Sequence, residues 1–177
     1  MHWAHRRACL RCYSANLSFP PEVCQIWWKG IRGLQWKNLL VQIFKLVESG
    51  PSPDVIVIHG GGNDVGKQLE LLLMFKNDFH LLQKHFPRAR LIFSEIVPRL
   101  IWLSAGKQRN LEKIRRRINH AMEKFMPKLG GFSFRHTELE GGFPGLYRQD
   151  GIHLSDVGLD IFNSDIQTMI EKAAVLG

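Results

Sequence analysis

A carboxylate and an imidazole stand three residues apart near the C-terminus, in the segment Asp150-Gly151-Ile152-His153. An imidazole with an ordinary pKa of about 6.5 can take a proton from an attacking hydroxyl and return it to a leaving group. A carboxylate within reach of the same ring fixes its tautomer and stabilises the imidazolium. We therefore predict that His153 is a general base and that Asp150 orients it. The alternative is a plain turn at Asp150-Gly151 ahead of a helix start at Ser155.

A glycine-rich segment far upstream offers donors for a developing negative charge. Gly60-Gly61-Gly62-Asn63-Asp64 directly follows the apolar run at residues 55–58. Glycines allow a sharp turn that leaves backbone N–H groups facing an anion, and Asn63 adds a neutral side-chain donor. Fixed donors of this kind stabilise the oxyanion of acyl transfer. We predict that Asn63 is such a donor, supported by Gly61, Gly62 and Asp64. Alternatively, Asn63 and Asp64 only cap the following helix.

Strands and helices alternate along the chain, and this alternation predicts how the two segments are positioned. Helix-like patterns at this spacing between strands favour right-handed βαβ crossovers and a three-layer α/β fold around a parallel sheet. In such a sheet, ligands bind beyond the carboxyl ends of the strands, where both segments are expected. The predicted strands are residues 23–28, 55–58, 91–96 and 132–134, and the predicted helices are residues 1–15, 34–48, 67–85, 108–129 and 155–175.

Length and composition predict one ordinary intracellular domain spanning residues 1–177. The chain has 45% hydrophobic residues, and no apolar run approaches the roughly 20 residues that span a bilayer. Its N-terminus lacks the apolar core of a secretory signal. Three cysteines do not form a disulfide framework, so we expect a reducing, cytoplasmic compartment.

One cysteine pair raises the alternative of a metal site. Cys9 and Cys12 form a CxxC motif near His2 and His5, which allows a zinc site. Because a second pair at the usual spacing is missing, we favour two helix cysteines one turn apart. The sequence thus predicts neither a metal nor a cofactor.

Excess positive charge suggests a second class of function. The formal net charge is +8, and the densest basic stretch is Arg115-Arg116-Arg117, preceded by Lys107, Arg109 and Lys113. A cationic helix face can bind phosphate backbones or an anionic membrane surface without sequence preference. The alternative function is therefore a non-catalytic basic α/β module that binds such a surface. A solvated helix face explains the same charges more simply, since no aromatic residues interleave them.

The two chemical segments resemble blocks of the SGNH hydrolase family, also called GDSL-like esterases. That family has a nucleophilic Ser after its first strand, a Gly after the second, Gly-x-Asn-Asp after the third and Asp-x-x-His near the C-terminus. Gly61 to Asp64 resembles the third block and Asp150 to His153 the last, while the second falls in residues 30–34. More narrowly, residues 3–8 and Trp28-Lys29-Gly30 with Trp36 look like SGNH-type esterase domains of fish retroelement-derived proteins.

This resemblance implies a reaction and a strand order. It implies hydrolysis of a small ester or acylated substrate, with Asn63 and the Gly33 backbone as oxyanion donors and Gly30 as the fallback for Gly33. It further implies the flavodoxin-like strand order 2-1-3-4-5.

The first family block, with its serine, is not found. The expected nucleophile would fall upstream of Met1, and Ser14 and Ser18 lie about a helix length from the predicted site. We therefore expect an N-terminally truncated domain that has no nucleophile, is inactive as written, and lacks the central strand. Buried unpaired backbone groups cost about 1–3 kcal/mol each against a net stability of about 5–15 kcal/mol, so instability or aggregation is expected.

Overall fold

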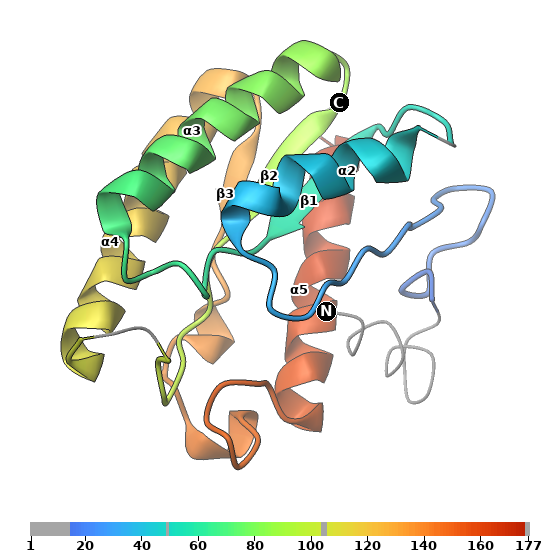
Figure 1. Cartoon of the computed structure of the whole chain (residues 1–177). Coiled ribbons are helices and arrows are strands. Elements are labelled where there is room, and N and C mark those ends of the chain that lie inside the picture. The colour runs from blue at the N-terminus through green and yellow to red at the C-terminus, as the bar shows by residue number, and fades with distance from the viewer. Residues whose placement is uncertain (1–14, 49, 104–105, 176–177) are drawn as a thin grey trace.

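Three parallel strands and four flanking α-helices make up the described part of the protein. The structure is a computed structural model that describes residues 15–48, 50–103 and 106–175. Strands β1 (Val55–His59), β2 (Arg90–Ser94) and β3 (Phe132–Phe134) pair in the order β1-β2-β3, as Figure 1 shows. The predicted α/β class is thereby confirmed. The flanking helices are α2 (Leu39–Val47), α3 (Gln68–His85), α4 (Gln108–Phe125) and α5 (Asp156–Val175).

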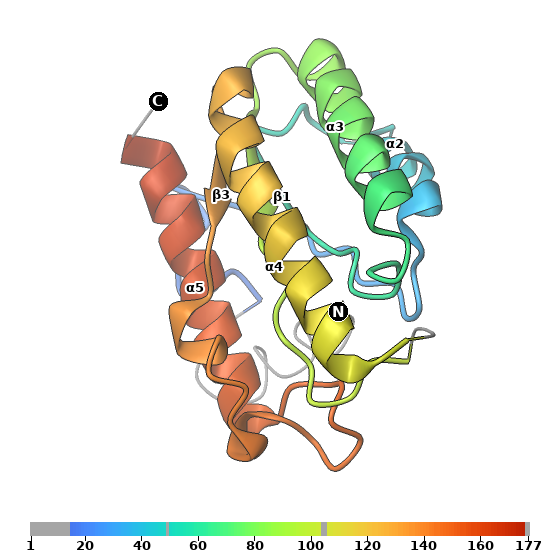
Figure 2. The same ribbon diagram turned by 90° about the vertical axis from the view of Figure 1, so that its left-hand side faces the viewer.

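The sheet lies between two hydrophobic clusters. Helices α2, α3 and α4 cover one face, where Phe75, Phe79 and Ile118 are fully buried against Phe93 and its neighbours. Helix α5 covers the other face through Phe162, Ile166 and Met169, which pack with Ile92. Figure 2 shows α5 on the opposite side of the strands from α3. Burial on both faces explains why the strands read as nearly continuous apolar runs.

Two helix ends are each set by a single residue. The N–H of Gly158 donates to Ser155 Oγ over 3.2 Å, so Ser155 is the N-cap of α5, where the helix start was predicted. The helix predicted at residues 108–129 consists of α4 followed by a short 3-10 helix, η2 (Met126–Leu129). Gly130 ends it with a φ of 70°, a left-handed conformation that favours glycine.

The strand predicted at residues 23–28 is wrong. This segment is irregular, and its backbone is held by a neighbouring loop: Ile26 N donates to Asn16 Oδ1 over 2.8 Å. Trp28 Nε1 donates to Ala15 O over 2.6 Å, and both Ile26 and Trp28 pack on the cluster beneath α5. An apolar run becomes a strand only beside a partner strand, and β1 pairs within the described residues with β2 alone.

Two predictions concern the N-terminal segment and the helices. The helix predicted at residues 1–15 lies outside the described residues except for its last residue, as do Cys9 and Cys12. Among the described helices, none combines the length and the apolar character needed to cross a membrane.

Candidate functional site

Asp150 and His153 form a hydrogen-bonded pair at the tip of the loop before α5. The imidazole Nδ1 lies 2.7 Å from Asp150 Oδ2, and the other carboxylate oxygen accepts the backbone N–H groups of Ile152 and His153, each over 2.9 Å. Hydrogen bonds from the backbone and ring of His153, and from Ile152, hold the pKa of Asp150 well below its usual range. Because the carboxylate accepts the hydrogen bond from Nδ1–H, the neutral imidazole has its free lone pair at Nε2.

The rest of the loop fixes this tip against the segment that follows β2. Gly151 O accepts hydrogen bonds from Leu100 N and Ile101 N over 2.8 and 3.0 Å. Gly151 has a φ of 64°, and a Cβ there would lie 3.0 Å from Ile101 Cγ1. The phenol of Tyr147 donates to Pro98 O over 3.0 Å, which ties the same two segments at a buried position. His153 and Asp150 are thus exposed side chains on an anchored backbone.

Asn63 and Gly33 lie on adjoining turns. Asn63 Nδ2 donates to Leu34 O over 3.0 Å, so the amide contacts the residue after Gly33. Gly33 has a φ of 67° in a turn closed by a bond from Leu34 N to Ile31 O. The structure therefore brings the two predicted oxyanion donors into one region. The fallback residue, Gly30, lies in the irregular segment before this turn.

Backbone N–H groups gather in the glycine-rich turn after β1. The N–H groups of Gly61, Gly62 and Asn63 donate to no acceptor within the described residues, while Asp64 N closes the turn onto Gly61 O at 2.9 Å. Gly61 has a φ of 92°, and a Cβ there would lie 2.5 Å from the Phe75 ring. Glycine is therefore required at this position. The carboxylate of Asp64 accepts a hydrogen bond from the backbone N–H of Trp36 over 3.0 Å, which holds the glycine-rich turn against the segment at Trp36.

Arg99 contacts the Asn63 turn from the segment after β2, and its role was not predicted from the sequence. Its Nη2 donates to Asn63 Oδ1 over 3.2 Å, and its guanidinium packs against the backbone of Gly62. Burial lowers the pKa of Arg99, and the negative charge of Asp150 partly offsets this. The next residue, Leu100, donates its N–H to Gly151 O, so the segment after β2 contacts both loops. The available signal was its position just after β2, at the carboxyl edge of a parallel sheet.

The His153 ring has no serine hydroxyl hydrogen-bonded to it among the described residues. No serine among residues 15–48, 50–103 and 106–175 forms a hydrogen bond with its ring, and Asp150 is the ring's hydrogen-bond partner there. Ser18 has a φ of 63° and lies in the irregular N-terminal loop. Ser14 lies outside the described residues.

A buried polar chain beneath α5 was not expected from the sequence. His136 is 1% exposed and joins Ser94 to Asp165 by hydrogen bonds of 2.8 and 2.7 Å. His59 Nδ1 lies 3.0 Å from the same Ser94 hydroxyl. By contrast, the side chains of His80, His85 and His120 are exposed. Alternation along the strands, which places His59 and Ser94 on one sheet face, was the signal that could have found this chain.

Helix α4 exposes fewer positively charged side chains than its sequence suggests. Arg115 is fully buried and pairs with Glu112 and Glu140 over 2.7 and 2.8 Å, so its predicted role in binding an anionic surface is wrong. Arg116 and Arg117 remain exposed, although Arg116 pairs with Glu112 over 3.0 Å. Across the described ranges, no cluster of three or more His, Cys, Asp or Glu residues is arranged to hold a metal ion.

Comparisons with known proteins leave the site to be interpreted from its own chemistry. No family model matches the chain, and no curated protein matches it.

Proposed function

We propose that this site is the base-and-oxyanion half of an SGNH-type ester hydrolase. The observation that supports it most is the 2.7 Å bond between His153 Nδ1 and Asp150 Oδ2, which leaves Nε2 free as a base. The bond from Arg99 to Asn63 adds support together with the bonds from Leu100 N and Ile101 N to Gly151 O, since the segment after β2 then contacts both the Asn63 turn and the loop that carries His153.

The proposed reaction uses each group in one role. His153 Nε2 takes the proton of an attacking nucleophile while a new bond forms at the ester carbonyl carbon. The Gly33 and Asn63 donors stabilise the charge on the carbonyl oxygen, and Arg99 adds a positive charge nearby. The ester C–O bond then breaks, and the imidazolium returns its proton to the leaving alcohol. Asp150 holds the tautomer throughout.

We further infer that β1, β2 and β3 correspond to the third, fourth and fifth strands of the flavodoxin-like order 2-1-3-4-5. Their parallel pairing and neighbour order support this assignment. The edge of β1 away from β2 is then the position of the central strand, which in the family precedes the nucleophilic serine. The serine-bearing strand of the family would then lie at the edge of β1 that has no partner strand among the described residues.

An external nucleophile tests the proposal without relying on a serine. Hydroxylamine attacks a p-nitrophenyl ester to form a hydroxamate and release nitrophenol, with His153 accepting the N–H proton. We expect the chain to accelerate hydroxamate formation, and we expect His153→Ala to remove the acceleration. Equal rates for the two proteins would contradict the assignment of His153 as base.

The same assay without hydroxylamine tests whether the chain contains a nucleophile of its own. We expect the chain alone to hydrolyse the ester no faster than His153→Ala does. Turnover that depends on His153 and passes through a covalent acyl-protein adduct, detected by mass spectrometry, would show that a residue of this chain is the nucleophile, whereas turnover without an adduct would show that His153 activates water. His120→Ala is a matched control, because this exposed histidine on α4 lies outside the site.

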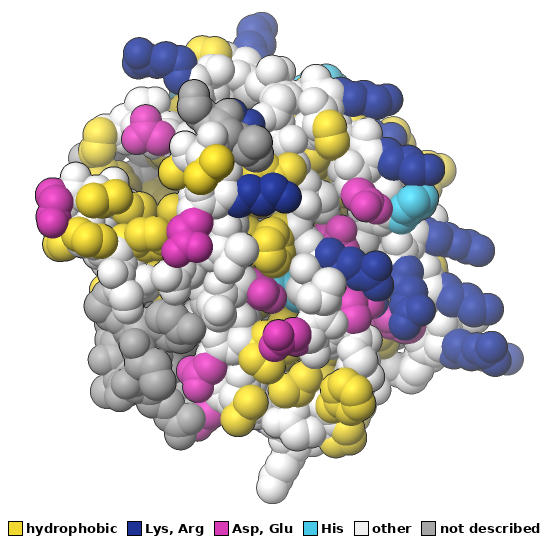
Figure 3. Space-filling view, turned by 180° about the vertical axis from the view of Figure 1, so that it is seen from behind, with side chains coloured by type: hydrophobic (Ala, Val, Ile, Leu, Met, Phe, Trp, Pro, Cys, Tyr) yellow, Lys and Arg dark blue, Asp and Glu magenta, His cyan; other side chains and the backbone are white. Residues whose placement is uncertain are grey.

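A second candidate function rests on the exposed cations of α4. Figure 3 shows Lys and Arg side chains gathered along one side of the molecule. A nucleic-acid-binding surface would retain the chain on immobilised DNA at low salt and release it as salt rises. Loss of retention in Arg116→Ala/Arg117→Ala would support this function, and unchanged retention would exclude it. The exposed cations on α4 are Arg109, Lys113, Arg116, Arg117 and Lys124.

A further inference from the structure

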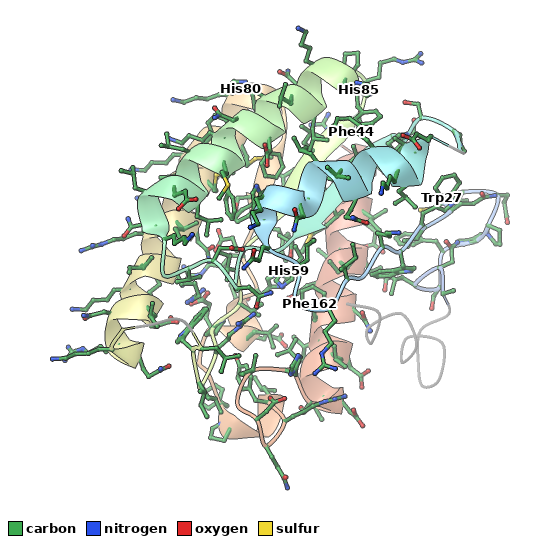
Figure 4. The ribbon with its side chains drawn as sticks, in the orientation of Figure 1. Trp27, Phe44, His59, His80, His85 and Phe162 are labelled. Carbon is green, nitrogen blue, oxygen red and sulfur yellow. The ribbon has the colours of Figure 1, made fainter. Side chains whose placement is uncertain are left out.

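Four polar side chains form one hydrogen-bonded chain between the sheet and α5. His59 and Ser94 are the last residues of β1 and β2 and lie side by side in the parallel register. From Ser94 Oγ, hydrogen bonds run 3.0 Å to His59 Nδ1 and 2.8 Å to His136 Nε2. His136 Nδ1 lies 2.7 Å from Asp165 Oδ2 on α5. Figure 4 shows His59 beside Phe162, whose ring stacks on His136 with centroids 5.0 Å apart.

When both histidines are neutral, the donor and acceptor properties of these groups fix the direction of every hydrogen bond between them. The Asp165 carboxylate only accepts, so His136 carries its proton on Nδ1 and presents a lone pair at Nε2. The Ser94 hydroxyl therefore donates to His136 and accepts from His59, whose proton must stand on Nδ1. The lone pair at the far end of the chain is His59 Nε2.

The two ends of this hydrogen-bonded series, His59 and Asp165, lie in different surroundings. The residue after His59 is Gly60, which opens the proposed oxyanion loop, and the charge of Arg99 acts on the His59 ring. At the other end, the Asp165 side chain is 22% exposed. It borders a hollow of about 280 Å³ that is also lined by Glu138, Asp160, Ile161 and Ser164.

We propose that His59, Ser94, His136 and Asp165 form a proton relay between the oxyanion loop and the hollow beside α5. A proton that binds His59 Nε2 displaces the Nδ1 proton to Ser94 Oγ, and the serine passes its own hydroxyl proton to His136 Nε2. The result is a neutral His59 with its proton on Nε2 and an imidazolium at His136 beside the Asp165 carboxylate. Protons balance, and no covalent bond between heavy atoms changes.

The packing favours a relay over a second catalytic triad. Ser94, His136 and Asp165 have the hydrogen-bond order of a Ser-His-Asp triad. However, Ser94 is fully buried, so no ester can approach its oxygen. Movement of a proton needs no such access, because it uses only the hydrogen bonds already present.

A carboxylate stands at one end of the relay. Asp165 on α5 contacts His136, whereas β3 contributes the apolar ring of Phe134. His59 faces His136 and the positive charge of Arg99, and burial is the largest cause that lowers the pKa of His59. A proton that reaches His136 therefore lies beside a counter-charge that His59 lacks.

Histidine NMR on the full chain tests the relay directly. With ¹⁵N-labelled histidines assigned by single His→Gln variants, we expect His59 and His136 both in the Nδ1–H form at pH 8. On acidification, His136 gains a proton at Nε2, and the His59 proton moves from Nδ1 to Nε2 with the same midpoint. Different midpoints for the two events, or an Nε2–H form of His59 at pH 8, would overturn the proposal.

Removing the serine hydroxyl should uncouple the two rings. In Ser94→Ala we expect His136 to titrate while His59 shows no tautomer change at that midpoint. Ser133→Ala is the matched control, because that hydroxyl lies on neighbouring β3 and bonds to Glu95 instead. Coupled titration that persists in Ser94→Ala would exclude the relay. If this variant does not fold, the two midpoints of the unmodified chain still decide the question.

Discussion

Arg99 donates a hydrogen bond from Nη2 to Asn63 Oδ1 over 3.2 Å, which orients the amide of the proposed oxyanion donor. With its oxygen held by the guanidinium, the Asn63 amide directs Nδ2 toward the turn at Leu34. Leu100, the next residue, donates its N–H to Gly151 O in the loop that carries Asp150 and His153. The segment after β2 therefore contacts both parts of the proposed site.

Arg99→Gln should lower the His153-dependent rate of hydroxamate formation by about tenfold, equivalent to about 1.4 kcal/mol of transition-state stabilisation. In Asn63→Ala, which already lacks the oriented amide, the added Arg99 substitution should have a smaller effect. A double-mutant cycle measures this coupling. Arg88→Ala, an exposed arginine beyond α3, should leave the rate unchanged. Fully additive effects would show that Arg99 does not act through Asn63.

Asp150 should remain ionised throughout the acidic range in which ordinary aspartates protonate. Its carboxylate accepts two backbone N–H groups and the His153 ring, and these bonds lower its pKa. A carbon-13 titration should show no protonation of this carboxyl between pH 7 and pH 3. In His153→Ala, which keeps the backbone bonds but loses the ring, the pKa should rise toward its usual value. A normal aspartate midpoint in the unmodified chain would contradict the structure.

Replacing the carboxylate tests its role in orienting the base. Asp150→Asn presents a neutral amide to Nδ1, which no longer favours the tautomer with a free Nε2. We expect a loss of at least about 100-fold in the His153-dependent rate. The circular dichroism spectrum should be unchanged, because the pair is exposed and an Asn oxygen can still accept the backbone N–H groups. An unchanged rate would remove Asp150 from the proposed mechanism.

Local signals in the sequence predicted the parts of the site that depend on neighbouring residues. The Asp150–His153 pair forms within one loop, and the glycine turn before Asn63 follows directly from its own backbone requirements. Arg99 and the relay could not be found this way, since each depends on side chains 29 to 42 residues apart that meet only in the sheet. Periodicity places a residue on a face of an element but does not say which side chains face it across the sheet.

The fold shows the same division between local and non-local information. Strands β1, β2 and β3 and helices α2 to α5 were predicted from apolar patterns and breakers, with boundaries within a few residues. Residues 23–28 have an equally apolar pattern but no partner strand within the described residues, so they pack as an irregular segment around Asn16. The buried Arg115 was misassigned for a related reason, because its partner Glu140 lies 25 residues away.

Arg115 should contribute to stability, in contrast to the exposed arginines beside it. Its side chain is fully buried between Glu112 and Glu140 and also donates to Ile96 O over 2.7 Å. Removing one partner of a buried ion pair costs about 3–5 kcal/mol, so Arg115→Ala should lower the free energy of unfolding in urea by this amount. Arg117→Ala, on the exposed face, should change it by less than about 0.5 kcal/mol. Similar effects of both substitutions would show that Arg115 is not buried as described.

Acid should destabilise the protein through His59. Burial, followed by the charge of His136, lowers the pKa of His59 to about 3, whereas the unfolded chain protonates this ring near its ordinary value of about 6.5. Between these values the unfolded state binds more protons than the folded state, so stability falls as pH decreases from about 6.5 toward 3. The slope from this one group is at most about 1.4 kcal/mol per pH unit.

Urea unfolding at several pH values between 7.5 and 4.5 measures this slope. Glu95 acts in the opposite direction, because burial raises its pKa and favours the folded state on protonation. The contribution of His59 is therefore the difference between the unmodified chain and His59→Gln, whose stability should depend less on pH. His120→Gln controls for the loss of a histidine, since its side chain is 63% exposed. Parallel pH profiles for the unmodified chain and His59→Gln would mean that the ring protonates equally easily in both states.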